Sequence, residues 1–397
     1  MNDFTFYSPT KFVFGRGAEN KVGELVRSFG GTKALLHFGG GSAKRSGLYD
    51  RVEKSLADAG VGSVALGGVR PNPRSGLVRE GIALCRKEKV DFVLAIGGGS
   101  VIDSAKAIAF GTLYEGDFAD FYFGKDVKNQ PQVPAALPVG TVLTIAAAGS
   151  EGSANSIINL EPGNLKRGAT GDALRPKFSV LNPELTFTLP PFQTACGLTD
   201  IFAHVVERYF TPTKDVLVTD EFCEAVMRTV VAESAKVLAD PKDYEARANI
   251  MWAGTVAHNN VCGVGRAQDW SSHGIEHELS ALYDCAHGAG LAVVMPAWME
   301  YVMEADITRF ARFARRVWDV NEAEPRAAAA EGLRRYRAWL KSIGMPLNFK
   351  ELGAKEEDIP KLVATLGLKG NTLGSFRPLD EKDVTDILRI ACGETVG

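Results

Sequence analysis

The stretch Phe92-Val-Leu-Ala-Ile-Gly97-Gly-Gly-Ser100, with the segment Val101–Ala109 that follows it, decides the fold class of this chain. The short apolar run before the glycines predicts a buried strand, and the run after them predicts a helix. Glycines between a strand and a helix N-terminus let a diphosphate approach the backbone amides at the positive end of the helix. Ser100 adds a hydroxyl donor to the turn.

A second turn of this kind, Gly39-Gly40-Gly41-Ser42, follows the predicted strand Ala34–Phe38. Neither turn has the G-x-G-x-x-G or P-loop spacing, and one alone could be a simple tight connection. Two such turns at strand ends of one sheet indicate a nucleotide site. The strand ends without a carboxylate for ribose hydroxyls, while Ser42, Lys44 and Arg45 lie close by. These donors favour the 2′-phosphate of NADP over NAD.

The first half of the chain alternates predicted strands with predicted helices. The strands are 12–14, 34–38, 63–66, 92–96 and 178–181, with further strand character in 135–148, and the helices are 19–28, 48–59, 76–87 and 101–109. This alternation predicts a mostly parallel sheet with helices on both faces. We expect loops at 129–134 and 161–172.

The second half, from Leu189-Pro190-Pro191 onward, has helical periodicity. Its predicted helices are 194–210, 215–238, 244–262, 269–283, 287–303, 307–320 and 327–343. We therefore place a domain boundary at the proline pair, with a dinucleotide-binding α/β domain at 1–190 and an all-helical domain at 191–397. A chain of 397 residues is long enough for two cores at about 100–200 residues per domain.

The composition excludes several classes of protein. With 45 Lys and Arg against 48 Asp and Glu, the net charge is −3, which gives no electrostatic footprint for nucleic acid or an anionic membrane. The segment Met1–Arg16 has no apolar core of a signal peptide, and no apolar stretch approaches the ~20 residues that cross a bilayer. The 6 cysteines form no C-x-x-C pair. We expect a soluble cytoplasmic protein with reduced thiols.

Histidines give the strongest chemical signal. His273 and His277 stand four residues apart, His287 follows, and Asp200 and His204 repeat the four-residue spacing upstream. On a helix this spacing places both side chains on one face. Two such pairs on different helices predict a mixed N/O site for a divalent cation such as Zn²⁺ or Fe²⁺. Five candidates exceed what a three- or four-ligand site needs, so one remains for proton transfer, and spacing alone does not say which.

The other histidines and the cysteines give less evidence of a chemical role. His37 and His258 have no partner at metal-ligand spacing, and we interpret both as structural. Cys285 stands two residues before His287 and could ligate a metal, but a buried thiol is the expected state.

On these residues the sequence resembles the iron-containing (group III) alcohol dehydrogenase family, in particular its butanol dehydrogenase-like, NADPH-dependent aldehyde reductase branch. The similarity spans the whole chain, and the histidine segment is highly specific. The matching segments are 39–42, 95–103, 149–151, 181–184, 189–191, 200–204, 269–290, 296–298 and 378–384. The resemblance implies a Rossmann-like α/β N-terminal domain, an all-α C-terminal domain and a site in the cleft between them, the dehydroquinate synthase-like architecture.

The resemblance also implies roles for individual residues. Four residues would bind the metal: Asp200, His204, His273 and His287. His277 falls where the family keeps a histidine close to the nicotinamide and substrate, and it is the catalytic candidate. The residues implied to hold the cofactor are Gly39, Gly40, Gly41, Ser42, Gly97, Gly98, Gly99, Ser100, Val101, Asp103, Thr144 and Lys166. Ala148 stands where relatives often carry a threonine hydroxyl.

The function expected from this resemblance is reversible, metal-assisted hydride transfer between NADP(H), preferred over NAD(H), and a primary alcohol or aldehyde of butanol-like size. The metal would be one divalent ion, Fe²⁺ or Zn²⁺, and the family often dimerises through the N-terminal strand, here 12–14. One alternative is a glycerol-like polyol dehydrogenase or a dehydroquinate synthase-like lyase, although only Lys166, Arg167 and Arg175 offer a basic pocket to the lyase. Another is a non-catalytic metal-binding scaffold.

Overall fold

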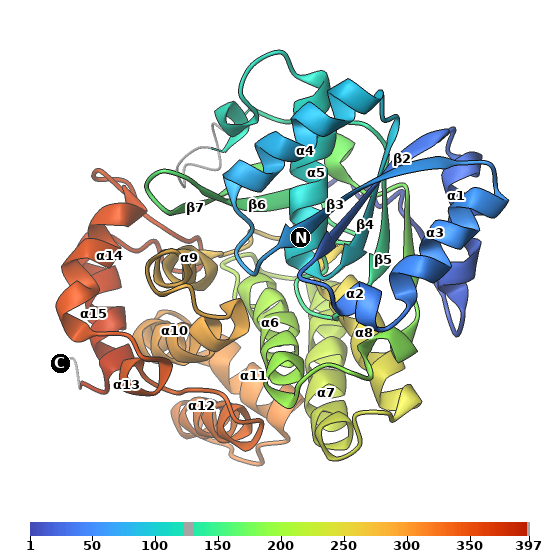
Figure 1. The fold of residues 1–397 in the computed structure, drawn as a ribbon. Helices are drawn as coiled ribbons and strands as arrows, with labels where there is room; N and C mark the ends of the chain where they lie inside the picture. The colour runs from blue at the N-terminus through green and yellow to red at the C-terminus, as the bar shows by residue number, and fades with distance from the viewer. Residues whose placement is uncertain (123–130, 395–397) are drawn as a thin grey trace. The chain divides into compact units, whose positions relative to one another are not determined.

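The computed structural model describes residues 1–122 and 131–394 and divides the chain into two compact units (Figure 1). One unit comprises Tyr7–Thr188, and the other comprises Leu189–Gly397 together with Met1–Phe6. The first residues join the helical unit because the backbone N–H of Asn2 donates a hydrogen bond of 2.8 Å to the carbonyl of Gly265.

The α/β unit is built on a six-stranded sheet in the order β1-β8-β5-β4-β2-β3. These strands are β1 (Lys11–Phe14), β2 (Lys33–Gly39), β3 (Gly62–Val69), β4 (Phe92–Gly97), β5 (Val139–Leu143) and β8 (Phe178–Leu181). Every neighbouring pair is parallel, which confirms the predicted sheet. The carboxyl ends of its strands therefore meet at one edge, where ligands bind in folds of this class.

Helices cover both faces of this sheet (Figure 1). The helical segments of the unit are η1 (Ala18–Lys21), α1 (Val22–Ser28), α2 (Ser42–Arg45), α3 (Leu48–Asp58), α4 (Ser75–Glu88), α5 (Gly99–Leu113), η2 (Phe118–Phe121), η4 (Asp172–Leu174) and η5 (Pro183–Thr186). Figure 1 shows α4 and α5 on one face and α1 and α3 on the other. The α1 and α3 face buries an apolar core that includes Val26, Val52 and Leu56 from the helices and Leu36 and Leu94 from the strands.

An antiparallel hairpin replaces one of the predicted loops. Strands β6 (Asn155–Leu160) and β7 (Leu165–Thr170) pair with each other in a separate two-stranded sheet, so the prediction of a loop over 161–172 is wrong. Pro162 and Gly163 mark the turn as expected, but β7 reads Leu-Lys-Arg-Gly-Ala-Thr, which lacks the apolar alternation that indicates a strand. In the other predicted loop, residues 131–134 have no regular structure, and 129–130 lie outside the described residues.

The second unit is helical, as the sequence predicts. Its helical segments are α6 (Pro191–Tyr209), α7 (Leu217–Ala239), α8 (Tyr244–His258), α9 (Ser271–Tyr283), α10 (His287–Val302), η6 (Met303–Ala305), α11 (Ile307–Trp318), α12 (Pro325–Ser342), α13 (Phe349–Leu352), η7 (Glu356–Asp358), α14 (Ile359–Leu366) and α15 (Glu381–Cys392). The sequence did not predict the helical segments from α13 onward. Across 1–122 and 131–394, no helix combines the length and the apolar character that a membrane span requires.

Helix α6 runs through the core of this unit and is buried along nearly its whole length. Phe202, in the middle of α6, lies with its ring centroid 5.0 Å from those of Tyr336 and Trp339 on α12. Burying aromatic side chains of this size contributes strongly to the stability of a core. The packing fixes α6 in place and with it the two polar residues, Asp200 and His204, that the helix carries inward.

Candidate metal centre and cofactor residues

Helix α6 brings Asp200 and His204 together because residues four apart share a helix face. Both are buried, with exposed fractions of 4% and 5%. The Oδ1 atom of Asp200 lies 3.0 Å from Nδ1 of His204. That Nδ1–H donates to the backbone carbonyl of Asp200 at 2.8 Å, so Oδ1 itself accepts no hydrogen bond.

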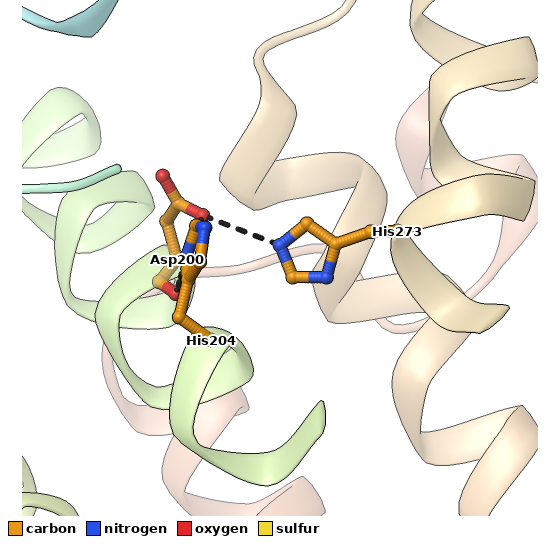
Figure 2. A group of neighbouring side chains, drawn as sticks. All are labelled: Asp200, His204 and His273. Atoms are coloured by element: carbon orange, nitrogen blue, oxygen red, sulfur yellow. Dashed lines mark hydrogen bonds and ion pairs between the residues drawn. The ribbon is translucent and has the colours of Figure 1, made fainter. Parts of the chain in front are cut away.

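Two more histidines approach the same carboxylate oxygen from other helices. His273 on α9 places Nε2 3.9 Å from Asp200 Oδ1, and His287, the first residue of α10, places Nε2 3.7 Å from it. Figure 2 shows His273 facing Asp200 and His204 across the gap between α9 and α6. The structure thus gathers all four residues that the resemblance implies as metal ligands.

The donor set fits a divalent cation. Asp200 Oδ1 and His273 Nε2 are both buried without a hydrogen-bond partner, which is costly unless another group binds them. Ligand atoms of Asp200, His204 and His273 lie within 4.8 Å of one another. A cation bound at about 2.0–2.2 Å by nitrogen and carboxylate oxygen needs ligand atoms spaced in this way. One carboxylate and three imidazoles suit Zn²⁺ or Fe²⁺.

The electrostatics of the cluster also favour a cation. Burial would raise the pKa of the Asp200 carboxyl, but the imidazoles of His204 and His287 hold that pKa well below its usual range. For His273, burial opposes the charged form, yet the carboxylates of Asp200 and Glu207 raise its pKa to about 9. The pKa of His204, by contrast, is lowered, first by burial. The carboxylates that stabilise a proton on His273 also attract a metal dication.

His277 lies one helical turn beyond His273 on α9 and is half-buried. Its ring centroid is 5.6 Å from that of His287, and Glu276, His277 and His287 form a second group whose polar atoms lie within 4.8 Å of one another. His277 therefore lies beside His287, whose Nε2 is 3.7 Å from Asp200 Oδ1. This position suits a group beside the metal rather than a ligand.

His258, interpreted from the sequence as structural, lies against the cluster. Its ring centroid is 4.4 Å from that of His204, and its Nδ1 accepts a hydrogen bond of 2.8 Å from Arg208. The guanidinium of Arg208 also stacks 4.4 Å over the Trp270 ring. His258 thus packs behind a candidate ligand, a role that its position in the sequence did not indicate.

Two buried glutamates that the sequence did not single out complete the surroundings of the histidines. Glu207 accepts from Nδ1 of His273 at 3.1 Å and from the His273 backbone N–H at 2.8 Å. Glu276 is hydrogen-bonded to Nδ1 of His287. Each glutamate stands three residues after a candidate ligand, Glu207 after His204 and Glu276 after His273, and this i,i+3 spacing is the signal that could have found them.

The candidate cofactor residues belong to the α/β unit. Strands β2, β4 and β5 are neighbours, and the first glycine turn, the second glycine turn and Thr144 follow their carboxyl ends in that order. The backbone N–H of Thr144 donates to the carbonyl of Gly97 at 3.1 Å. Gly98 precedes α5, and a Cβ there would lie 2.0 Å from Cγ2 of Ile145, so the turn requires glycine. Gly41 needs it for its φ of +112°.

Asp103 lies on α5, after the second glycine turn, and Lys166 lies on β7. The Asp103 carboxylate accepts hydrogen bonds from Ser150 Oγ at 2.5 Å and from the N–H of Ile157 at 3.0 Å, so it supports the segment before β6. Burial raises the pKa of Asp103, and the charge of Lys166, itself buried on β7, lowers it. Lys106, one turn along α5, is fully buried and donates to the carbonyls of Ser150, Ser153 and Asn155 at 2.7–3.0 Å.

Comparison with known proteins identifies the family. The family described as "Iron-containing alcohol dehydrogenase" matches residues 9–183, and the "Fe-containing alcohol dehydrogenase family, C-terminal" matches residues 194–392. The chain belongs to the iron-containing alcohol dehydrogenases. It is an oxidoreductase of a family that implies a metal and a nicotinamide cofactor.

Individual relatives of this alcohol dehydrogenase align with nearly the whole chain. It is 39% identical to NADH-dependent butanol dehydrogenase A of Clostridium acetobutylicum, over 98% of this chain and 99% of that protein. It is 34% identical to an NADPH-dependent aldehyde reductase of Escherichia coli, over 94% and 95%. The crystal structure of NADH-dependent butanol dehydrogenase A from Thermotoga maritima superimposes with a TM-score of 0.94 at 43% identity, over 98% and 99%. The names divide between NADH and NADPH, so they give no support to the predicted NADP preference.

Proposed function

We propose that this alcohol dehydrogenase catalyses reversible hydride transfer between a nicotinamide cofactor and a primary alcohol or aldehyde of butanol-like size, with a divalent cation bound by Asp200, His204, His273 and His287. The observation that carries the proposal is a pair of buried atoms without a hydrogen-bond partner, Asp200 Oδ1 and His273 Nε2, which lie 3.9 Å apart. The matching set of relatives named butanol dehydrogenases and aldehyde reductase supports the substrate class.

When bound, the cation would polarise the substrate oxygen as a Lewis acid, and the nicotinamide would give or take the hydride. The protein supplies the surroundings for this chemistry. Asp200, His204 and His273 are buried, which excludes bulk water from three of the four ligands, while the His287 side chain stays 23% exposed. That partial exposure gives a small substrate its approach to the metal. His277, half-buried beside His287, would hold or deliver the proton that the alcohol oxygen gains or loses.

For the cofactor we infer that NADP(H) is preferred over NAD(H). Strand β2 ends at Gly39 without a carboxylate, and α2 carries Lys44 and Arg45 directly after the turn. The Arg45 guanidinium lies 3.2 Å from the point where a Cβ on Gly41 would stand. Two cations and no competing acid suit a 2′-phosphate. A kcat/KM with NADPH below that with NADH would overturn this preference.

For the assembly we propose a homodimer that pairs through β1. This strand lies at the edge of the six-stranded sheet, and Phe14 on it has an exposed fraction of 45%. An open strand edge with exposed apolar side chains offers backbone groups to a second copy. Light scattering on the purified protein gives the mass, and a monomer at micromolar concentration would contradict the proposal.

The deciding experiment follows NADPH and NADH oxidation with butanal, on the protein as purified, after chelation, and after adding Fe²⁺ or Zn²⁺ back. We expect oxidation that the chelator abolishes and the metal restores. Metal-loaded protein that oxidises neither cofactor would overturn the proposed reaction and favour a lyase or a metal-binding scaffold on the same fold. Activity that survives complete metal removal would overturn the role of the cluster.

A further inference from the structure

The three candidate histidine ligands share one feature: Nδ1 of each ring already has an oxygen partner. For His204 the partner is the backbone carbonyl of Asp200, for His273 it is the carboxylate of Glu207, and for His287 it is the carboxylate of Glu276. A hydrogen bond to Nδ1 fixes the tautomer and leaves Nε2 as the ligand nitrogen. Two of these partners are side chains that cost free energy to bury, so their presence calls for an explanation.

Glu276 is held by a dedicated arrangement. Its side chain is fully buried, and the hydroxyl of Ser280, one turn along α9, donates to its Oε1. Its Oε2 faces Nδ1 of His287 on the neighbouring helix α10. A Cβ on Gly290 would stand 2.7 Å from Glu276 Oε1, so a glycine on α10 provides the space that the carboxylate occupies. Three residues on two helices thus fix one carboxylate in one orientation.

Glu276 directs its Oε2 at an imidazole nitrogen of His287 and not at Asp200 Oδ1. Its Oε2 contacts Nδ1 of His287 directly, which leaves no room for a metal ion between these two atoms. The atoms around Asp200 Oδ1 differ, since the Nε2 atoms of His273 and His287 stand 3.9 Å and 3.7 Å away from it. The geometry therefore separates the atoms that enclose a cation from those that orient the ligands.

We propose that Glu276 is the positioning residue of the metal centre that sets the ring orientation and ligand strength of His287. The proposal rests on the proposed function to the extent that it takes the cluster to be a metal centre. Among the four candidate ligands, His287 has the most exposed side chain, at 23% against 5–7% for the other three. It is therefore the ring that packing restrains least. A carboxylate on Nδ1 both holds the ring and increases the basicity of Nε2.

Glu207 acts on His273 in the same way but has a second task. It also accepts from the backbone N–H of Trp270 at 2.8 Å and from that of His273, and so fixes the start of α9. Removal of Glu207 would disturb the helix as well as the imidazole. Glu276 gives the cleaner test because its carboxylate contacts the side chains of Ser280 and His287 and lies against the space at Gly290.

The test measures Co²⁺ affinity of the full chain by competition with a chromophoric chelator, together with the visible spectrum of bound Co²⁺. For Glu276→Ala we expect affinity to fall about 10–100-fold, the usual cost of losing such a partner, with a changed spectrum. Glu276→Gln keeps an acceptor and loses the charge, so its affinity should lie between those of wild type and Glu276→Ala. Ser280→Ala, which leaves the carboxylate in place, should weaken binding least.

A matched control is Glu224→Gln on α7. Glu224 is also fully buried, but it pairs with Arg312 and Arg316 instead of a histidine. This variant should lose stability and keep the Co²⁺ affinity and spectrum of the wild type. Wild-type affinity and spectrum in both Glu276 variants would overturn the positioning role, and so would an equal loss in Glu224→Gln. Wild type that binds Co²⁺ and reduces no aldehyde would contradict the proposed function alone, whereas wild type that binds no Co²⁺ would overturn both.

Discussion

The proposed metal centre of the helical unit and the glycine turns of the α/β unit are built in opposite ways. At the metal centre, buried side chains from α6, α9 and α10 converge, and histidine nitrogens are in turn bound by a carbonyl or a carboxylate. At the turns the side chains are absent, so that backbone N–H groups and helix ends remain open to a ligand. We therefore expect the metal centre to lose function when a ligand side chain is removed. We expect the glycine turns to lose function when a side chain is added.

The largest expected effect is on the metal centre. His204→Ala removes a ligand from α6, and we expect loss of the bound metal and of at least about 10³-fold in kcat, because polarisation by a metal is worth several kcal/mol. Metal analysis and butanal reduction measure both. His37→Gln is the matched control, a buried histidine of the other unit that should keep its metal. Full metal content and near-normal kcat in His204→Ala would show that the ligand assignment is wrong.

A buried charge in the α/β unit gives the second effect. Lys106 is fully buried beside Asp103 and Glu151, and burial lowers its pKa to about 8. Lys106→Met should reduce the free energy of unfolding by about 3–5 kcal/mol, because three buried carbonyls lose their donor and Asp103 loses one of its two nearby cations. The exposed Lys54, paired with Asp58, is the control, and its loss should cost less than about 1 kcal/mol. Urea unfolding compares them, and equal losses would remove Lys106 as a support of the segment before β6.

The third effect is a pH dependence of stability. His37 is fully buried between the carbonyl of Leu66 and Ser104 Oγ, and burial lowers its pKa from 6.5 to about 4. Because the unfolded chain binds the proton first, stability is complete above pH 6.5 and falls as the pH drops toward 4, by about 3 kcal/mol in all. His37→Gln should remove this part of the acid sensitivity. Parallel stability curves for wild type and variant from pH 7 to 4.5 would contradict it.

The smallest effect separates a glycine needed by the fold from one needed by the ligand. A Cβ on Gly40 would meet nothing within 4 Å, whereas on Gly98 it would clash with Ile145. We expect Gly40→Ala to leave the free energy of unfolding unchanged and to weaken cofactor binding about tenfold, or about 1.4 kcal/mol. Gly98→Ala should cost about 1–3 kcal/mol of stability through overpacking. Unchanged NADPH and NADH affinity in Gly40→Ala would move the cofactor away from this turn.

The features that the sequence predicted are those with a local signal. Apolar periodicity located the strands of the parallel sheet and the long helices to within a few residues, and α5 begins at Gly99, the last glycine of its turn. The i,i+4 spacing pointed to the pairs Asp200 and His204 on α6 and His273 and His277 on α9, because a helix alone places such residues together, and His287 was the fifth candidate. The choice of four ligands among the five needed the family resemblance or the structure.

The features that the sequence did not predict depend on tertiary partners. The β6–β7 hairpin forms from segments with polar residues and glycine, and neither strand has a pattern of its own to mark it. Glu207 and Glu276 were missed for a related reason, since a charged residue on a helix is normally solvated. The structure shows that both are buried and that each contacts a histidine of another helix, His273 on α9 for Glu207 and His287 on α10 for Glu276.

Gly290 is a position at which the proposed metal centre could be changed without replacing a metal ligand. A single methyl group there would stand 2.7 Å from Glu276 Oε1 and 2.8 Å from its Cγ, so Gly290→Ala and Glu276 cannot both be accommodated as they stand. The two positions are therefore coupled, since a side chain at 290 requires the acid at 276 to shift, to be shortened or to be replaced. Metal affinity in a protein so changed could then drift, or be engineered, while Asp200 and the three histidines stay the same.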